Sequence, residues 1–514
     1  MKLAALAQAA GLELSGASDI AVTGFAIDHR KVAPGTVFGA FRGARFNAED
    51  FIPAAIEAGA VAVVARPQAK VAGAQHIASD EPRRAFAHLA SVFFRPVPAS
   101  VVAVTGTNGK TSTVEMTRQV WRMCGERAAS IGTLGVTTPD ESVSTGLTTP
   151  DIVTFLANMS GLAREGVTHV AYEASSHGLS QFRNEGVPLR ACAFTNFSRD
   201  HLDYHGTMDA YFNAKMRLFD EVAASGTPAV IWRDPSPASS DGLNWTDQAI
   251  KHAQKRDLSV LVVGEAEDQR DTYLRLVKRI PTQLGQTLTL LHEGTERTIS
   301  LPLIGAYQAA NALVAAGLVL ACGGDPALVF DALSRLQPVR GRLERACLTP
   351  GGAPVYVDYA HTPDALEAAI AALRPHVDAA QQGKLLVVFG AGGDRDPGKR
   401  ASMGEVAARG AELVIVTDDN PRGEDPAAIR AEIMRGARDI GGGVLQDIGD
   451  RKSAIAEAIA RASTPDIVLI AGKGHEQGQI IGSGEAMQVL AFDDVEVARR
   501  CAAEATGSVT GGAI

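Results

Sequence analysis

The chain has 514 residues, and at about 100–200 residues per domain this length predicts about three domains. With 46% hydrophobic and 21% charged residues it is not a disordered chain, and its net charge of −9 leaves no basic excess for binding a nucleic-acid backbone. The five cysteines are scattered and form no C-x-x-C pair, and no window approaches about 18 uncharged apolar residues. We therefore expect a soluble protein of a reducing compartment, with no structural zinc, no nucleic-acid partner and no membrane insertion.

Proline-rich stretches and changes of sequence pattern along the chain predict three segments. Residues 1–98 mix short β-branched runs with alanine-rich helical stretches and end in the proline-rich sequence FFRPVPAS. Residues 99–338 open on the apolar strand 101–104 and continue with strand–loop–helix units, whereas the alternation within 226–303 predicts antiparallel hairpins. The strand–loop–helix rhythm returns in residues 339–514. The pattern predicts an α/β fold of three domains, with mostly parallel sheets in the second and third.

The strongest local signal is the sequence VVAVTGTNGKTST at residues 101–113. A buried strand leads into Gly106, Asn108 and Gly109, and a helix begins at about Lys110 and Thr111. Glycines let backbone N–H groups wrap a phosphate, the lysine neutralises phosphate oxygens, and the threonine hydroxyl is a ligand for Mg²⁺. The other interpretation, a tight turn with an incidental lysine, does not explain why a strand precedes the loop and a helix follows it.

Three further places in the second segment carry candidate groups for phosphate chemistry. Glu173 follows the strand THVAYE, and the loop TNFSRDHLDYHG contains His201. Lys215 lies in the predicted helix DAYFNAKMRLF. Taken alone these are a strand-end acid, a hydrogen-bonded turn and a surface lysine. Because the carboxyl ends of neighbouring parallel strands meet at one edge of a sheet, they become candidate magnesium and substrate residues.

Four loops in the third segment end probable parallel strands and are rich in charged residues. They are VDYAHTPDAL (357–366), FGAGGDRDPGKR (389–400), TDDNPRGEDP (417–426) and AGKGHEQGQ (471–479). A solvated turn explains any one of them, but four at one sheet edge predict a binding site. Mixed arginines and carboxylates suit a ligand that carries both ammonium and carboxylate groups, such as an amino acid.

The motifs TGTNGKT, EASSHGL, FTNFSRDHLDYHG, GRLE, DYAHTPDAL, GGDRDPGKR, DNPR and AGKGHE occur in this order, and together the chain resembles the Mur ligase family. The resemblance covers nearly the whole chain. It implies a small N-terminal α/β domain that holds UDP (1–98), a central P-loop ATPase domain (99–338) and a C-terminal Rossmann-like domain (339–514). It also implies a reaction in which ATP, UDP-MurNAc-L-Ala-D-Glu and meso-diaminopimelate give the tripeptide, ADP and phosphate.

The resemblance assigns residues to each ligand. ATP is expected at Gly106, Thr107, Asn108, Gly109, Lys110, Thr111, Ser112, Asn311, Arg342 and Asp358. The expected catalytic residues are Lys110, Glu173, His201 and Lys215, and the expected Mg²⁺ ligands are Thr111, Glu173, His201 and a carboxylated Lys215. The UDP-muramoyl-dipeptide is expected at His29, Ala44, Arg45, Phe46, Thr148, Thr149, Ser175, Gln181 and Arg183, with Asp28 and Arg30 beside the first of these. Diaminopimelate is expected at Arg395, Asp419, Asn420, Pro421, Arg422, Gly472 and Glu476.

The chain departs from the family pattern at a few positions. His29 stands in place of a serine, Leu147 in place of an asparagine, and Ala391 in place of a cysteine. The stretches GAYQAAN (305–311) and WRDPSPASS (232–240) also differ, on the side expected to bind ATP. None of these changes removes a group that the chemistry needs.

Three alternatives stay open from the sequence. The same reaction with L-lysine lacks a role for Arg422, whose planar fork matches a second carboxylate. Folylpolyglutamate synthetase, a more distant ligase, does not account for the UDP-pocket pattern. A nucleotide-gated binding or scaffold protein would be expected to have a degraded P-loop or to have lost Glu173, His201 or Lys215, and the loop and all three residues are present. We expect a monomer in the cytoplasm.

Overall fold

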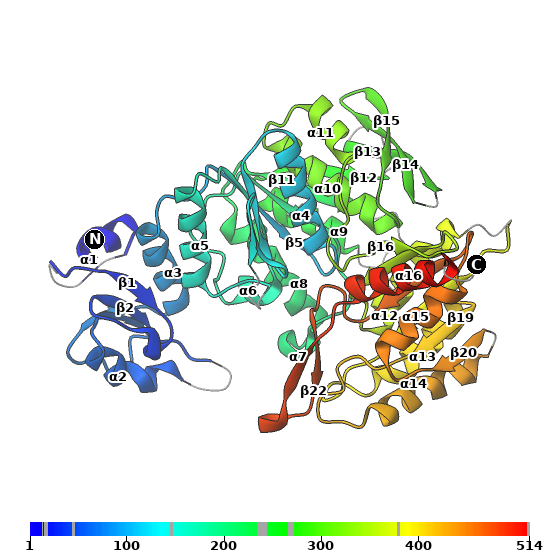
Figure 1. Cartoon of the computed structure of the whole chain (residues 1–514). Helices are drawn as coiled ribbons and strands as arrows, with labels where there is room; N and C mark the ends of the chain where they lie inside the picture. The colour runs from blue at the N-terminus through cyan, green and yellow to red at the C-terminus, as the bar shows by residue number, and fades with distance from the viewer. Residues whose placement is uncertain are drawn as a thin grey trace. The chain divides into compact units, whose positions relative to one another are not determined.

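The computed structural model describes the chain except for residues 13, 15–18, 44–46, 144–147, 234–243, 266–271, 283, 378–380, 442 and 511–514, and the side chains of 203, 485 and 506–510. By its internal packing the chain divides into two compact units (Figure 1). The first comprises residues 1–275 and 311–332, and the second comprises residues 276–310 and 333–514. The unit boundaries fall within three elements: β13 (Thr272–Thr282), α10 (Ala306–Ala321) and α11 (Pro326–Leu333).

The first unit begins with a small parallel sheet of order β1-β2-β3-β4. Its strands are β1 (Gly24–Ala26), β2 (Thr36–Gly39), β3 (Ala60–Ala65) and β4 (Gln75–Ala78), and its helices are α1 (Leu3–Ala9), α2 (Ile52–Glu57) and α3 (Pro82–Phe93), with 3-10 turns η1 (His29–Lys31) and η2 (Ala48–Phe51). One of the β-branched runs of this segment forms β3, which has only one residue that is not fully buried.

A larger sheet forms the rest of the first unit. Within the unit its order is β12-β11-β10-β5-β9-β6-β7-β8, parallel from β12 to β6. The strands are β5 (Ser100–Thr105), β6 (Ala128–Gly132), β7 (Gly135–Thr137), β8 (Ser142–Val143), β9 (His169–Glu173), β10 (Ala191–Phe194), β11 (Pro228–Arg233) and β12 (Ser259–Gly264). The helices are α4 (Lys110–Met123), α5 (Ile152–Arg164), α6 (Ser176–Ser180), α7 (Leu202–His205), α8 (Met208–Arg217), the π-helical turn η3 (Leu218–Val222) and α9 (Trp245–Lys255).

One hydrophobic core runs through the first unit. It includes Val37 and Phe86 from the N-terminal sheet and its helix α3, and Phe155 and Tyr172 from the central part, all of them buried. Helix α3 packs against α5, so the N-terminal segment shares its core with the central sheet. The central strand β5 is buried along its whole length. Its position in the sheet sets the position of the glycine loop that follows its carboxyl end.

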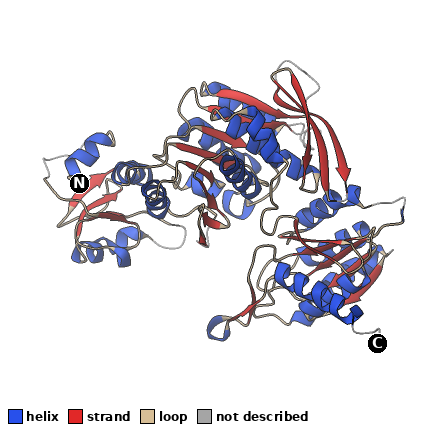
Figure 2. Ribbon diagram, turned by 45° about the horizontal axis from the view of Figure 1, so that its top comes forward, coloured by secondary structure: helices blue, strands red, loops and turns tan. Residues whose placement is uncertain are grey.

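The second unit is built around a six-stranded sheet of order β16-β17-β21-β18-β19-β20, parallel except for β16. Figure 2 shows helices packed against this sheet. The strands are β16 (Glu344–Leu348), β17 (Pro354–Asp358), β18 (Leu385–Phe389), β19 (Leu413–Val416), β20 (Val444–Asp447) and β21 (Ile467–Ala471), and the helices are α12 (Pro363–Leu373), η4 (Arg374–His376), α13 (Lys399–Gly410), α14 (Pro426–Ile440), α15 (Arg451–Arg461) and α16 (Asp494–Thr510).

Two hairpins complete the second unit. The strands β14 (Gly285–His292) and β15 (Thr295–Leu301) pair antiparallel, which confirms the hairpin predicted from the alternation of apolar residues. A shorter hairpin joins β22 (Gly478–Ile481), the turn η6 (Gly484–Ala486) and β23 (Gln488–Ala491). The predicted α/β class with mostly parallel sheets is confirmed.

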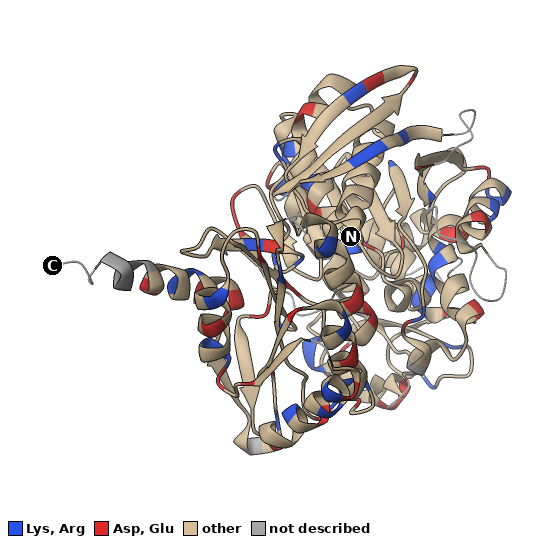
Figure 3. Ribbon diagram, turned by 90° about the vertical axis from the view of Figure 1, so that its right-hand side faces the viewer, with Lys and Arg blue, Asp and Glu red and all other residues tan. Residues whose placement is uncertain are grey.

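In the described part of the chain, charged residues of both signs are spread over many elements. Figure 3 shows Lys and Arg interspersed with Asp and Glu along the helices, so neither sign is confined to one element. No helix in the described part of the chain is both long enough and apolar enough to cross a bilayer.

Candidate active site

The glycine loop connects β5 directly to α4, as the sequence predicts. Gly106 and Gly109 have φ angles of +143° and +85°, a region that favours glycine. A Cβ atom at Gly106 would lie 2.0 Å from Thr195 Oγ1, and one at Gly109 would lie 2.3 Å from Asn311 Oδ1. Both positions therefore exclude a side chain for reasons of conformation and of space, which leaves the backbone of the loop open toward a phosphate.

Two side chains hold the loop from the end of the neighbouring strand β10. Thr195 Oγ1 donates to the carbonyl of Asn108 at 2.6 Å, and the Asn108 N–H donates to Asn196 Oδ1 at 2.9 Å. Lys110, the first residue of α4, folds back and donates from Nζ to the carbonyls of Gly106 (3.0 Å) and Thr107 (2.7 Å). The loop is thus held in a fixed shape with an ammonium group over its own backbone.

Lys215 lies beneath the same loop. It is 1% exposed, its Nζ donates to the Gly106 carbonyl at 2.7 Å, and it lies 4.3 Å from the centre of the Tyr211 ring. Burial, together with the charge of Lys110, holds the pKa of this amine well below its usual range. The interpretation of Lys215 as a surface lysine, which the residue taken alone favours, is therefore wrong. Lys215 is a buried amine beside the phosphate loop.

His201 lies on the loop after β10 and begins α7 with a left-handed φ of +50°. Its ring centre is 5.0 Å from that of His177 and 6.0 Å from that of Tyr211, the residue that also contacts Lys215. His205 extends the cluster, 5.2 Å from Tyr211. The structure therefore connects His201 to Lys215 through one shared aromatic neighbour.

Glu173 ends β9, which lies next to β5 in the sheet. Its carboxylate is 2% exposed and accepts from the Thr133 N–H at 2.7 Å and from Thr133 Oγ1 at 3.3 Å. Gly132 allows this approach, because a Cβ there would lie 2.2 Å from Glu173 Oε1. Neighbouring strand ends thus bring a buried carboxylate to the same edge of the sheet as the phosphate loop, as predicted.

The residues expected to hold the muramoyl dipeptide form a hydrogen-bonded network around Glu173. Thr149 Oγ1 donates to the Glu173 carbonyl at 2.9 Å and lies 2.9 Å from Ser175 Oγ, which caps α6. Arg183 donates from NH1 to the Thr149 carbonyl at 2.9 Å and from NH2 to Gln181 Oε1 at 2.6 Å. Thr148 joins the network, since its Oγ1 lies 3.1 Å from Thr133 Oγ1. Burial lowers the pKa of Arg183, although its guanidinium remains charged at any ordinary pH.

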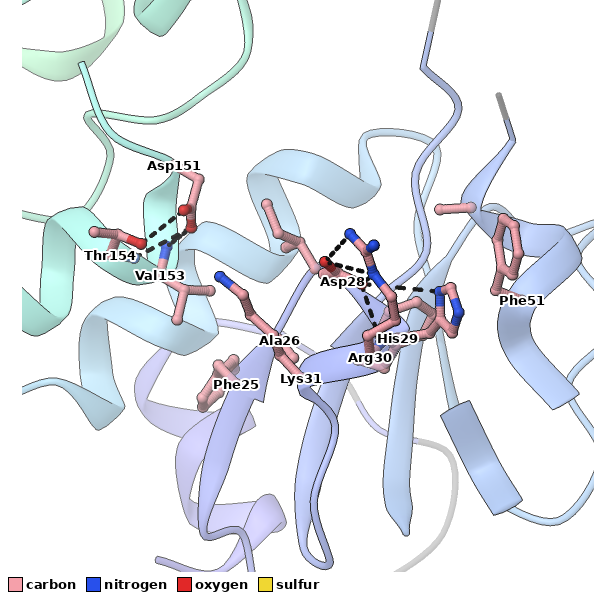
Figure 4. Close-up of a pocket in the computed structure, with 13 residues that line it drawn as sticks. Phe25, Ala26, Asp28, His29, Arg30, Lys31, Phe51, Asp151, Val153 and Thr154 are labelled. Carbon is pink, nitrogen blue, oxygen red and sulfur yellow. Dashed lines mark hydrogen bonds and ion pairs between the residues drawn. The ribbon is translucent and has the colours of Figure 1, made fainter. Parts of the chain in front are cut away.

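A cavity of about 520 Å³ lies beside η1 (Figure 4). Asp28, His29 and Arg30 line it, and the His29 ring stacks on Phe51 with a centroid distance of 4.4 Å and an interplanar angle of 5°. The Arg30 guanidinium beside Asp28 lowers the pKa of that carboxyl to about 2. Asp151, the cap of α5, lines the same cavity. The cavity offers an aromatic face and an ionised carboxylate, which suits a planar polar ring such as uracil.

Some positions named from the sequence fall outside the described residues. These are Ala44, Arg45 and Phe46 of the expected UDP loop, Leu147, and residues 234–240 of the stretch expected beside adenine.

In the second unit, Asp358 ends β17 and is 8% exposed. Its Oδ2 accepts from the Leu343 N–H at 2.8 Å, and burial raises its pKa to about 6 against the lowering effects of Arg342 and the backbone N–H groups. The Arg342 guanidinium lies 5.1 Å from the centre of the Tyr359 ring. Arg342 and Asp358 are therefore neighbours in this unit, whereas Asn311 belongs to the first unit, against Gly109.

The loops after β19 and β21 bring the expected amino-acid residues together. Asn420 Nδ2 donates to Glu476 Oε2 at 2.9 Å, and a Cβ at Gly472 would lie 3.2 Å from Asp419 Oδ2. Arg422 has a left-handed φ of +51°, and its NH1 donates to the Gly393 carbonyl at 2.9 Å, on the loop after β18. The prediction that these loops converge at one edge of the sheet is confirmed.

Three more residues at this edge of the sheet belong to the loop after β18 and to the proline turn. The Pro421 carbonyl lies 1.9 Å from where a Cβ would stand at Gly393, so this proline turn closes against the loop after β18. Arg395, on the same loop, is exposed. Ala391 is 4% exposed and belongs to the hydrophobic core, in agreement with a packing role for this departure from the family pattern.

The donors at the phosphate loop fit a magnesium ion that is shared with a phosphate. Among the described residues no group of three or more His, Cys, Asp or Glu side chains forms a metal cluster. Mg²⁺ does not need such a cluster, because it keeps several waters and binds through one or two carboxylates and phosphate oxygens. The Thr111 hydroxyl at the start of α4 and the Glu173 carboxylate supply oxygen ligands of that kind.

The sequence did not single out several side chains that the structure places at these sites. Thr133 binds Glu173, and Phe51 stacks on His29, but neither carries a local sequence signal. Asp151 does carry one, since an acid that precedes an apolar helical run is a typical N-cap. Lys473 belongs to the motif AGKGHE, in which the resemblance assigns only Gly472 and Glu476 to a ligand, and it is buried among Asp419, Asn420 and Glu476.

Comparison with known proteins gives the same picture over nearly the full length. Residues 104–319 match the Mur ligase middle domain, and residues 341–474 match the Mur ligase glutamate ligase domain. The chain is 57% identical to the UDP-N-acetylmuramoyl-L-alanyl-D-glutamate--2,6-diaminopimelate ligase of Zymomonas mobilis, over 97% of this chain and 98% of that protein. A solved structure of a ligase with the same name is 32% identical, covers 97% of this chain and 99% of its own, and has a TM-score of 0.73. A folylpolyglutamate synthase of Mycobacterium tuberculosis complexed with ADP and AMPPCP shares the fold at 21% identity and a TM-score of 0.56, over 74% of this chain and 89% of its own.

Proposed function

The chain belongs to the Mur ligase family, and we propose that it adds meso-diaminopimelate to the D-Glu γ-carboxylate of UDP-MurNAc-L-Ala-D-Glu at the expense of ATP, a step of peptidoglycan precursor synthesis. The observation that carries this proposal is the 57% identity, over 97% of the chain, to a ligase named for that reaction. Three structural features support the proposal. They are the glycine loop, the buried Glu173 and the convergent loops of the second unit.

The reaction requires activation of a carboxylate, because a carboxylate is a poor electrophile at neutral pH. The D-Glu γ-carboxylate attacks the γ-phosphorus of ATP, which releases ADP and forms an acyl phosphate. The diaminopimelate amine then attacks the acyl carbon, loses a proton, and expels phosphate as the amide forms. Catalysis of this kind depends on positioning and on stabilising negative charge, which are the roles we give to Lys110 and the loop N–H groups.

We propose that Thr111, Glu173, His201 and Lys215 hold magnesium, which when bound neutralises charge on the phosphate oxygens. Lys215 enters this set as a carbamate, formed when its neutral amine adds CO₂ and releases a proton. The position of this amine supports the proposal, because it is buried beside the Gly106 carbonyl, away from bulk water. The carbamate would change a buried cation into an anion with oxygen ligands.

We propose that the network of Thr148, Thr149, Ser175, Gln181 and Arg183 binds the muramoyl dipeptide, since it adjoins the carboxylate of Glu173. The cavity at His29 is then the place for the uridine end. His29, where the family pattern has a serine, offers a ring in place of a hydroxyl. Its stacking on Phe51 supports a base-packing role.

We assign the amino acid to the pocket of the second unit that contains Arg395, Asp419, Asn420, Pro421, Arg422, Gly472 and Glu476. Arg422, anchored on the Gly393 carbonyl, suits the second carboxylate of diaminopimelate, which L-lysine lacks. Arg342 and Asp358 of the same unit, with Asn311 of the first, are proposed to contact ATP. Folylpolyglutamate synthesis is not favoured, because the folate enzyme shares only the fold.

We further propose that the work is divided among three domains (1–98 for UDP, 99–338 for ATP, 339–514 for the amino acid) and that the enzyme acts as a monomer in the cytoplasm.

The test is ADP release by the purified protein with ATP, Mg²⁺ and UDP-MurNAc-L-Ala-D-Glu against a panel of amino acids. We expect turnover with meso-diaminopimelate and at least about a hundredfold lower kcat/KM with L-lysine, since one lost charged contact is worth about 1.5–3 kcal/mol and an unpaired arginine adds to the loss. A preference for lysine would overturn the substrate, and turnover with folate and glutamate would overturn the reaction.

A further inference from the structure

Lys473 is fully buried among residues that we assign to the amino acid. It follows β21, is 0% exposed, and lies with its Nζ 2.9 Å from Asn420 Oδ1, 3.4 Å from Asp419 Oδ1 and 3.4 Å from Glu476 Oε2. A buried ammonium is stable only where protein groups replace its water shell. All three of those groups are residues that we assign to binding the amino acid.

The contacts of Lys473 set the orientation of the Asn420 amide. An ammonium group only donates, so the amide must turn Oδ1 toward Lys473. The same oxygen accepts from the Ile480 N–H at 2.9 Å, and the Nδ2 group is then directed to Glu476 Oε2 at 2.9 Å. Lys473 and the Ile480 N–H together thus determine which end of the amide meets Glu476.

Lys473 also contacts two carboxylates, one buried and one partly exposed. Asp419 is 6% exposed, and the Glu476 side chain is 33% exposed. The ammonium group contacts both carboxylates, so it holds the two acidic side chains near each other against their mutual repulsion.

We propose that Lys473 is a positioning residue for the incoming amino acid: it fixes Asp419, Asn420 and Glu476 in the orientation that recognises the ammonium end of the ligand. The inference rests on the proposed function only for the identity of that amino acid. Lys473 makes its contacts with protein groups, so its effect should be confined to one substrate.

The experiment compares Lys473→Met with Lys452→Met as the matched control. Lys452 is on α15 of the same unit, has a half-exposed side chain, and makes a single surface ion pair with Glu504 at 3.7 Å. From ADP release, we expect Lys473→Met to raise the KM for diaminopimelate by about tenfold or more, in line with the loss of hydrogen bonds to a charged group. The KM values for ATP and for the UDP-dipeptide should stay within about twofold, and the control should match the wild type in all three.

Lys473→Gln serves where the methionine variant does not fold, as judged by circular dichroism. Its amide retains a donor for Asn420 Oδ1 but no charge, so we expect a smaller rise in the same KM. A folded variant with an unchanged diaminopimelate KM, or with equal rises for all three substrates, would overturn the proposal. If the wild type does not turn over diaminopimelate, the proposed substrate has failed, and the same comparison is made with the amino acid that the panel identifies.

Discussion

The charge state of Asp358 gives a quantitative test of the second unit. Its carboxyl is 8% exposed, and burial raises its pKa from 3.8 to about 6. The unfolded chain, where the group is solvated, titrates near the ordinary value. Between the two pKa values the folded protein therefore binds more protons than the unfolded chain, and this unit should become less stable as the pH rises.

The size of the effect follows from the shift. About 2 pKa units correspond to about 3 kcal/mol over the whole titration, of which about 1.4 kcal/mol is lost between pH 5 and pH 8. Asp358→Asn cannot titrate and keeps an acceptor for the Leu343 N–H, so it should lack this dependence. Acids with lowered pKa values, such as Asp28, give the opposite trend, but they are common to both proteins and cancel in the difference.

The assay is amide hydrogen exchange of β17, corrected for intrinsic rates, in the wild type and in Asp358→Asn. Relative to the variant, protection in the wild type should fall about tenfold from pH 5 to pH 8. Asp364→Asn, an exposed acid in the first turn of α12, is the control and should follow the wild type. Parallel profiles for wild type and Asp358→Asn, or a wild type that gains protection as pH rises, would refute the raised pKa.

Four further predictions concern the chemistry. Gly109→Ala should raise the KM for ATP and lower stability by about 1–3 kcal/mol, because φ is +85° and the new Cβ meets Asn311; an ATP titration and a melting curve without change would contradict this. Lys110→Met should lower kcat by about 10²–10³-fold while calorimetry shows unchanged UDP-dipeptide binding; near-normal kcat would remove Lys110 from the phosphate site. Arg422→Met should raise the diaminopimelate KM and reduce the preference over lysine, and an unchanged preference would argue against the carboxylate contact. Withholding Mg²⁺ should abolish ADP release until the ion is restored, and full activity in EDTA would exclude a metal role.

The phosphate loop could be predicted from sequence because its requirements are local. A buried strand, glycines at the turn and a lysine at the helix start are adjacent in the chain, and the structure places them in one loop. The rule that parallel strands end at one edge also predicted that the loops around Asp419 and Glu476 converge. What could not be predicted was the partner of each group. Asn311 lies about two hundred positions from Gly109 in the chain, and only the fold of α10 against the loop makes it the neighbour of that glycine.

The division of the chain into two packing units also could not be predicted from the sequence. The proline-rich sequence around residue 98 marks a change of composition, yet the hydrophobic core continues across it through α3 and α5. Composition along the chain reports where one segment ends, whereas the extent of a core depends on which faces meet.

Three buried or half-buried lysines show how the same residue type serves different ligands. The contacts of Lys110 with loop carbonyls carry no formal charge, so these contacts leave its positive charge directed at the place where phosphate is expected. Lys215 also contacts a loop carbonyl, but we propose that it acts as a carbamate. Lys473 instead contacts two carboxylates and an amide, and its charge is used within the protein. A phosphate pocket needs cations held by neutral groups, and a pocket for an ammonium group needs acids whose mutual repulsion has been relieved. It is the partner of each lysine, more than its position in a motif, that decides which anion or cation the pocket can bind.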